Sequence, residues 1–331
     1  MIYLAALERM SARELRTTPL SRLQEQTSPA QFERAAERLE RLANHGVSAI
    51  HFDEPRFPTL LREIPDPPAV LFLSGAIDAL THRCVGVVGA RRATQAGLTT
   101  AREVSGALAS RGVTVVSGLA LGIDSAAHAA ALEAGGPTVA VFGSGVHRVY
   151  PAANRPLAER IRDSNGLLIS EYHPDQEPRK QFFPERNRII SGLCEAVIVI
   201  EAGEQSGSLI TARMALEQGR DVLAVPGSIH ANQNRGCHRL IREGAGLLDS
   251  IATLLEELGL PEETAEPMTF SGEAQRIWES LDIESLPLDV LATRSSLSLG
   301  EAALAVVELE LAGFVDRSSG GYSRGARARA L

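Results

Sequence analysis

The segment "VGVVGARRATQAG", residues 85–97, places a glycine turn and two arginines directly after an apolar run. A glycine turn that opens a helix binds anions through its backbone N–H groups, and guanidinium groups beside it add hydrogen bonds to a phosphate. The segment has neither the G-x-G-x-x-G pattern of dinucleotide sites nor the G-x-x-x-x-G-K-[ST] pattern of P-loops. Gly89, Arg91 and Arg92 are therefore candidate phosphate ligands, although the two arginines are also typical of a solvated surface.

A second glycine loop raises the alternative of hydrolytic chemistry. Ser117 and Gly118 end the run "GVTVVSG" and are further candidate nucleic-acid ligands, but the run has no acidic residue at its end to bind a ribose, so NAD is not expected. Asp124 and His128 follow one turn apart and could act as an acid and a base. We favour a helix cap for Asp124, a packed side chain for His128, and a loop anchor instead of a catalytic acid for Glu201.

The densest basic signal is "RKQFFPERNR", residues 179–188. Lys180, Arg186, Asn187 and Arg188 stand next to two phenylalanines. Basic residues interleaved with aromatic rings are typical of single-stranded nucleic-acid binding, because rings stack on bases while cations meet phosphates. Tyr150 could also stack on a base, and it is equally typical of a core.

Two further loops contribute candidate anion ligands. The segment after residue 201 contains Ser206, Gly207 and Ser208 before a predicted helix that includes Thr211, and the segment 225–248 contains Arg235 and Arg239. A single phosphate needs one such loop, whereas a chain of phosphates needs several. The set of loops therefore favours a sugar-phosphate polymer as the ligand.

The elements that position these loops are short apolar runs alternating with helical stretches. The runs "CVGVVG", "GVTVVSG", "PTVAVFG", "GLLIS", "AVIVIEA" and "DVLAVPG" suit buried parallel strands. The sequence predicts a Rossmann-like, doubly wound α/β protein with a mostly parallel sheet. We predict a small helical N-terminal domain over 1–50, a DNA-binding core with an extended lead-in over 51–258, a linker over 259–271, and a winged-helix domain with a basic tail over 272–331.

Composition limits the other classes of function. The chain has 331 residues and a formal net charge of −8, but screening makes local basic surfaces decide nucleic-acid binding. No apolar run is long enough for a membrane span, and the N-terminus lacks the pattern of a secretory signal, so we expect a cytoplasmic protein without a membrane partner. The three cysteines are far apart, so we expect no metal site.

The chain resembles the DNA-processing protein A (DprA, also called Smf) family. The resemblance runs in order through "VGVVGARRAT", "SGLALGIDSAAH", "GSGVHRVYP", "FPERNRIISGL", "EAGEQSGSLITARMALEQGR" and "VPGSIHANQNRGCHRLIREGA". It implies a dimeric, non-enzymatic protein without a cofactor that binds single-stranded DNA and loads RecA recombinase during natural transformation. It also implies that Arg91 and the "RNR" element at 186–188 contact DNA.

Three interpretations stay open at this point. A Rossmann-like nucleotide N-glycoside hydrolase is the alternative to a recombination mediator. The helix "EAALAVVELELAGF" of the predicted winged helix has no Lys or Arg, so we favour protein interaction over duplex binding for that domain. His238, Leu240, Ile241 and Leu247 could serve self-association or recombinase docking, and core packing explains them equally well.

Overall fold

The computed structural model describes residues 14, 18, 20–261, 270, 272–281, 285–318 and 320–324. Its main sheet has the strand order β1-β2-β6-β5-β4-β3-β7-β8-β9. The strands are β1 (Ser48–His51), β2 (Val70–Gly75), β3 (Cys84–Val88), β4 (Thr114–Ser117), β5 (Thr138–Val141), β6 (Leu167–Ser170), β7 (Ala196–Val199), β8 (Asp221–Ala224) and β9 (Gly246–Leu247).

The six apolar runs predicted as strands are β3 to β8, and the mostly parallel, doubly wound sheet is confirmed. Neighbouring strands from β6 to β9 are parallel, whereas β2 pairs antiparallel with β6 and β1 antiparallel with β2. Chain order reverses between β3 and β7, which lie side by side at the centre. This reversal is a topological switch point, the place where ligands bind in open α/β sheets.

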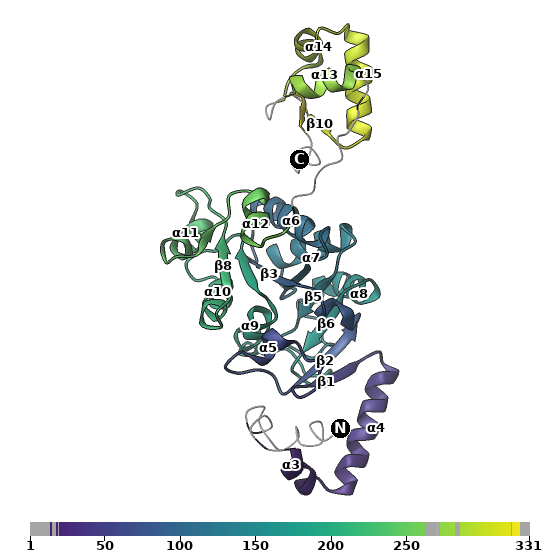
Figure 1. Ribbon diagram of the computed structural model, residues 1–331, viewed down its shortest axis with the longest axis vertical. Coiled ribbons are helices and arrows are strands. Elements are labelled where there is room, and N and C mark those ends of the chain that lie inside the picture. The colour runs from purple at the N-terminus through teal and green to yellow at the C-terminus, as the bar shows by residue number, and fades with distance from the viewer. Residues whose placement is uncertain are drawn as a thin grey trace. The chain divides into compact units, whose positions relative to one another are not determined.

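Helices cover both faces of the sheet (Figure 1). One face carries α6 (Gln95–Ala109), α7 (Ile123–Glu133), α8 (Arg155–Asp163) and α12 (Ile251–Glu257), and the other carries α5 (Thr59–Arg62), α9 (Phe182–Leu193), α10 (Ser208–Glu217) and α11 (Arg235–Arg242). Short 3₁₀ helices lie at Ile77–Leu80, Ala152–Asn154 and Asn232–Asn234.

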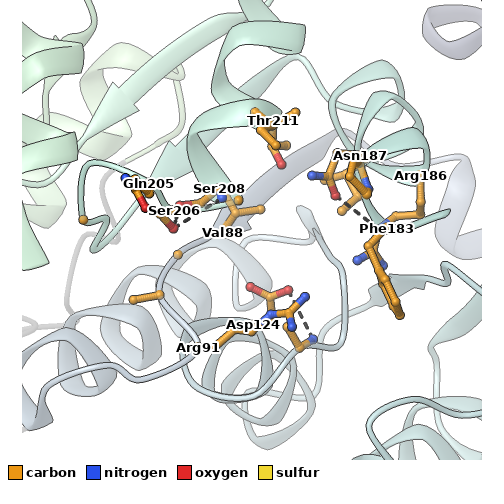
Figure 2. Close-up of a pocket in the computed structure, with 18 of the residues that line it drawn as sticks. Val88, Arg91, Asp124, Phe183, Arg186, Asn187, Gln205, Ser206, Ser208 and Thr211 are labelled. Atoms are coloured by element: carbon orange, nitrogen blue, oxygen red, sulfur yellow. Dashed lines mark hydrogen bonds between the residues drawn. The ribbon is translucent and has the colours of Figure 1, made fainter. Parts of the chain in front are cut away.

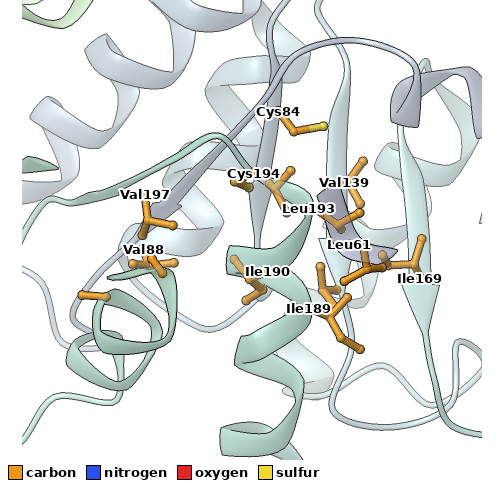
Figure 3. Packing of buried hydrophobic residues seen from close by; sticks show 14 of the residues in the cluster. Leu61, Cys84, Val88, Val139, Ile169, Ile189, Ile190, Leu193, Cys194 and Val197 are labelled. Atoms are coloured by element: carbon orange, nitrogen blue, oxygen red, sulfur yellow. The ribbon is translucent and has the colours of Figure 1, made fainter. Parts of the chain in front are cut away.

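The main core lies between the sheet and the face that carries α9 (Figure 3). Ile189 and Ile190 of α9 pack in one cluster with Leu61 of α5 and with Val139 and Ile169 of the sheet. All five side chains are at most 1% exposed. Burial of such a side chain contributes about 1.5–3 kcal/mol, so this packing fixes α9 against the strands.

The N-terminal helices α3 (Leu20–Gln26) and α4 (Pro29–Asn44) belong to the same compact unit as the sheet. Ser28 precedes a proline at the first turn of α4, and its backbone N–H donates to the Gln31 side chain at 2.8 Å. Leu42 of α4 packs with Phe72 of β2. The boundary predicted at residue 50 falls inside β1, which is joined to β2 by a full ladder.

The second compact unit comprises residues 259–331, and most of the predicted linker and of the basic tail lies outside the described residues. It contains α13 (Gly272–Ser280), α14 (Leu288–Ser295), α15 (Leu299–Leu311), β10 (Val315–Ser318) and β11 (Gly321–Arg324). Three helices and a two-stranded wing pack around their own core, which includes Ile277, Leu291, Leu309 and Phe314. The predicted winged helix is confirmed.

No single helix in the described ranges is long and apolar enough to cross a membrane. The bent pair α14 and α15 passes that test on length and composition alone, and its buried residues form the core of the winged helix.

Candidate nucleic-acid interface

A cleft of about 1060 Å³ opens at the carboxyl ends of β3 and β7, at the switch point of the sheet. Its walls are the loop after β3, the loop after β7 with the start of α10, and the first half of α9, together with Tyr150 from the loop after β5 and Lys180 from the loop after β6. Figure 2 shows Gln205, Ser206 and Ser208 on one side of the cleft and Phe183, Arg186 and Asn187 on the other. The fold thus brings together segments that are more than 100 residues apart.

The described lining residues include four basic side chains and a single carboxylate. Arg91 and Arg92 stand on the loop after β3, and Lys180 stands just before α9; all three are exposed. Exposed guanidinium and ammonium groups on a concave surface attract anions and are free to donate hydrogen bonds to phosphate oxygens.

Aromatic rings lie beside these cations. The guanidinium carbon of Arg91 is 5.8 Å from the ring centroid of Phe183, and the Tyr150 and Phe183 centroids are 5.2 Å apart. A side pocket of about 70 Å³ opens between the two rings and Gly118. Tyr150 is 47% exposed, so its ring presents a face to solvent at the edge of the cleft.

The opposite wall offers hydroxyl groups at the start of a helix. Ser206 Oγ and Ser208 Oγ are 2.7 Å apart, and the first residues of α10 lie on the cleft wall together with Thr211. The N–H groups of Ser208, Leu209 and Ile210 donate to acceptors on Ser206 and Gly207, so the start of α10 presents the positive end of its helix dipole and these hydroxyl groups. This wall can therefore hold a second anion across from the arginines.

Arg186 lies in the cleft wall but is only 5% exposed. Its Nη1 donates to the carbonyl of Gly118 at 2.9 Å and to the carbonyl of Val141, so it joins the ends of β4 and β5. Burial lowers the pKa of Arg186 to about 10, which still leaves the guanidinium charged at neutral pH, while the nearby Asp124 opposes that shift. Arg186 contributes a fixed positive charge and holds two loops in place.

Asp124 completes this buried arrangement. Its Oδ2 accepts from the backbone N–H of Gly118 at 3.1 Å and from that of Ala120 at 3.3 Å. Burial raises the pKa of Asp124, and the charge of Arg186 opposes that rise. A Cβ on Gly118 would stand 2.6 Å from Nη2 of Arg186, so only glycine allows the approach. Asp124 is therefore part of the loop scaffold.

Glu201 anchors the first glycine loop from the neighbouring strand. Its carboxylate is 2% exposed and accepts from the Thr94 hydroxyl at 2.7 Å and from the Thr94 backbone N–H at 3.1 Å. The Thr94 hydroxyl in turn accepts from the N–H of Gly97 and caps α6. The structure supports the anchor interpretation of Glu201.

His128 is fully buried in α7, away from the cleft. Its Nδ1 lies 2.7 Å from the Thr138 hydroxyl, which donates its own proton to the carbonyl of Val115. Burial, together with the charge of Arg186, lowers the pKa of His128 to about 3, so the ring is neutral. It cannot reach a ligand in the cleft, as the interpretation of a packed histidine predicts.

Several predicted DNA ligands lie outside the cleft. Arg188 donates to Glu171 at 2.6 Å and to Asp66 at 3.1 Å, and its side chain is only 14% exposed. Ser117 is fully buried and donates to the Val87 carbonyl at 2.6 Å. Arg235 faces Glu204 at 3.8 Å, and Arg239 faces Glu243 at 3.7 Å. By contrast, the cleft gathers Gly89, Arg91, Arg92, Lys180, Arg186, Asn187, Ser206, Gly207, Ser208 and Thr211.

The four residues considered for self-association differ in exposure. Leu240 is 5% exposed and belongs to the main core, and Ile241 packs against the same core. His238 contacts the Gly227 carbonyl through Nε2 at 3.0 Å. Leu247, on the edge strand β9, is 47% exposed and presents apolar surface.

The cleft also contains two residues that the sequence alone does not assign as DNA ligands. The motif shows Phe183 only as an aromatic neighbour of the basic residues, and nothing in the sequence singles out Gln205, although each lines the cleft. Their positions in the sequence could have indicated them. Gln205 follows the end of a strand. Phe183 precedes Arg186 by three residues, so Phe183 and Arg186 share one face of the helix.

The fold and the cleft define a Rossmann-like protein with an arginine-lined anion site at the switch point of its sheet, followed by a winged helix. Residues 48–259 match the family model described as DNA recombination-mediator protein A, and residues 261–321 match that of the DprA winged helix domain. The chain belongs to the DNA recombination-mediator protein A family.

Individual relatives agree with this assignment. Protein Smf of Escherichia coli is 39% identical over 302 residues, which cover 88% of this chain and 80% of that protein. A crystal structure of DNA processing protein A from Streptococcus pneumoniae has a TM-score of 0.62 and 43% identity, covering 70% of this chain and 82% of that one. The Helicobacter pylori protein has a TM-score of 0.58 and 29% identity, covering 64% and 95%; its structure gave insight into a unique single-stranded DNA binding mode.

We predict that His128 makes the free energy of unfolding fall by about 2 kcal/mol between about pH 7 and about pH 5. Its pKa is about 3 in the folded chain and returns to 6.5 on unfolding, so the unfolded state binds more protons between these values. The contribution of the neutral His128 ring to stability is fully present above the unfolded-state pKa of 6.5, and it decreases as the pH falls through that value. Urea unfolding followed by circular dichroism should show a shallower pH dependence for His128→Gln; equal pH dependence of the two proteins would contradict the prediction.

Proposed function

We propose that the chain binds single-stranded DNA across the cleft and acts as a recombination mediator. The observation that carries the proposal is the arrangement of anion-binding groups on both walls of one open cleft, with Arg91 and Lys180 exposed beside aromatic rings. A pocket for one nucleotide needs a single phosphate site. Cations on one wall, and hydroxyl groups at the positive end of a helix dipole on the other, suit successive phosphates of a strand.

The aromatic pair gives the proposal its preference for single strands. The faces of Tyr150 and Phe183 beside the side pocket are accessible only to a base that is not paired and stacked within a duplex. Base–aromatic stacking contributes about 1–3 kcal/mol per base and tolerates every sequence. The cleft should therefore bind strands with little regard to sequence.

The recombinase and the second copy of the chain are proposed as partners because the chain belongs to this family. We infer a cytoplasmic protein that delivers RecA recombinase to the bound strand during natural transformation and works as a homodimer. Single-strand binding by the Helicobacter pylori relative supports the DNA part of this inference. The exposed edge strand β9 with Leu247 offers a surface for self-association, because an unpaired sheet edge can accept a second chain.

No observation favours the nucleotide N-glycoside hydrolase. Glu201 and Asp124 accept hydrogen bonds from backbone N–H groups of the loops, and His128 contacts Thr138 through Nδ1 away from the cleft, so the three do not converge on one point of the cleft. A general acid or base must lie within hydrogen-bond reach of the reacting group. We therefore propose binding without catalysis and without a cofactor.

Replacement of Arg91 and Lys180 by alanine should raise the dissociation constant for single strands of any sequence by about tenfold or more. The log–log salt slope should become shallower by about 0.7 for each phosphate that the variant no longer neutralises. Fluorescence anisotropy across a salt series measures both. Arg102→Ala combined with Arg160→Ala, at exposed positions of α6 and α8, removes the same charge and is the matched control, and an unchanged constant in the Arg91 and Lys180 variant would reject the cleft as the DNA site.

Tyr150→Leu should weaken single-strand binding by about 1–3 kcal/mol, whereas Tyr150→Phe should retain most of the affinity because the ring is kept. A strand that carries 2-aminopurine reports stacking directly through fluorescence quenching. Equal affinities for the Leu and Phe variants would show that the ring does not stack on DNA.

The winged helix should contribute little to this binding. Its helix α15 exposes Leu304, Val307 and Leu311 and has no basic residue, which favours contact with a protein. A chain ending at Leu258 keeps the main core intact, so its affinity for single strands should stay within about twofold of the full chain. A large loss in the anisotropy assay would assign DNA contacts to the winged helix.

A further inference from the structure

A second cleft, of about 570 Å³, lies between helix α4 and the loops that follow β5 and β6. Helix α4 contributes Arg34, Arg38 and Arg41, and the two loops contribute His147 and His173. None of these side chains belongs to the DNA cleft described above. The cluster therefore needs its own explanation.

The arginines form one stripe of the helix. Positions 34, 38 and 41 are separated by four and three residues, a spacing that places side chains on a single face. The helix buries Ala35 and Leu42 against the sheet. Among the described residues, the exposed guanidinium groups of Arg34 and Arg41 have no ion-pair or hydrogen-bond partner. These two cations do not serve the fold.

The facing wall contacts the arginines of α4 but does not neutralise their positive charge. Arg38 Nε donates to His173 Nε2 at 3.2 Å, and burial, with the charge of Arg38, lowers the pKa of His173, so this ring is a neutral acceptor. Asp175 is 3.1 Å from His147 Nδ1 and is thus engaged on the far side of the cleft. Glu37 is the remaining acid of the described lining, against three arginines.

We propose that this second cleft binds phosphates of the same DNA strand that occupies the first cleft, so that the strand continues from the sheet onto helix α4. The inference rests on the proposed function and extends it to a second site. Its basis is that the same two loops form a wall of each cleft. Tyr150 of the first cleft is three residues from His147 of the second, and Lys180 is five residues from Asp175.

These loops also set the spacing between the clefts. Five extended residues span at most about 18 Å, which bounds the separation of Lys180 from Asp175. Known single-strand sites of about 4–16 nucleotides can cover such a separation. Arg179 stands on the loop between Asp175 and Lys180 and is exposed, so it adds positive charge to the path between the clefts, whereas Arg148 on the other loop pairs with Glu177 at 3.3 Å.

The test compares a short strand of about 6 nucleotides with a long one of about 20 nucleotides, because only the long one can occupy both clefts. In the full chain, Arg34→Ala combined with Arg41→Ala should weaken long-strand binding by about tenfold and reduce the salt slope by about 0.7 for each phosphate left without a cation. Binding of the short strand should stay within about twofold. Fluorescence anisotropy gives all three quantities.

The matched control is Arg102→Ala combined with Arg160→Ala, which removes the same charge from exposed helix positions outside both clefts. An equal loss in this control, or unchanged long-strand affinity in the α4 variant, would overturn the proposal. So would equal losses for short and long strands, since these would trace to the first cleft or to the fold. If the Arg91 and Lys180 variant keeps its affinity for the short strand, the first cleft is not a DNA site. That result would reject the proposed function and is distinguishable from failure of the second-cleft proposal.

Crosslinking tests whether the strand contacts the second cleft directly. A long strand with 4-thiothymidine at the end beyond the first cleft should crosslink on irradiation to the peptide that contains α4 or to the loop around His173. Crosslinks confined to the first cleft would contradict a strand path across both. Unfolding temperatures of all variants within a few degrees of the parent exclude a loss of structure as the cause.

Discussion

The arrangement of the cleft at the switch point depends on the buried guanidinium of Arg186. An arginine with 5% exposure is tolerated only if its donors are satisfied, because removing a charge from water costs several kcal/mol. The carbonyl groups of Gly118 and Val141 accept from Nη1, Asn187 Oδ1 accepts from Nε at 3.3 Å, and the nearby Asp124 carboxylate balances the charge. Because Arg186 belongs to α9, these contacts join that helix to the ends of two neighbouring strands.

The cleft gains preorganised donors from this constraint. Phe183 precedes Arg186 by one helical turn, so fixing Arg186 also fixes the ring against which Arg91 and Tyr150 lie. On the other side, Glu201 holds Thr94 and with it the loop that carries Arg91. A ligand then meets groups already in place and loses less conformational entropy on binding.

Neighbouring arginines in this protein have different physical roles. Arg186 is buried and structural, Arg188 is neutralised by two acids, and Arg91 is exposed toward the cleft. Exposure and the nearest acid decide which role a guanidinium has. The same criterion distinguishes the exposed Arg34 and Arg41 on α4 from Arg38, which donates to His173.

The strands, the winged helix and the loops that face the cleft could be predicted from the sequence, because buried parallel strands need continuous apolar runs and loops at their carboxyl ends need glycine. It also indicated Arg91 and Lys180. It could not separate Arg186 from Arg188, two residues apart in one motif. That distinction depends on Gly118, 68 residues away, and Asp66, 122 residues away, and only the tertiary structure brings such distant acceptors within hydrogen-bond distance.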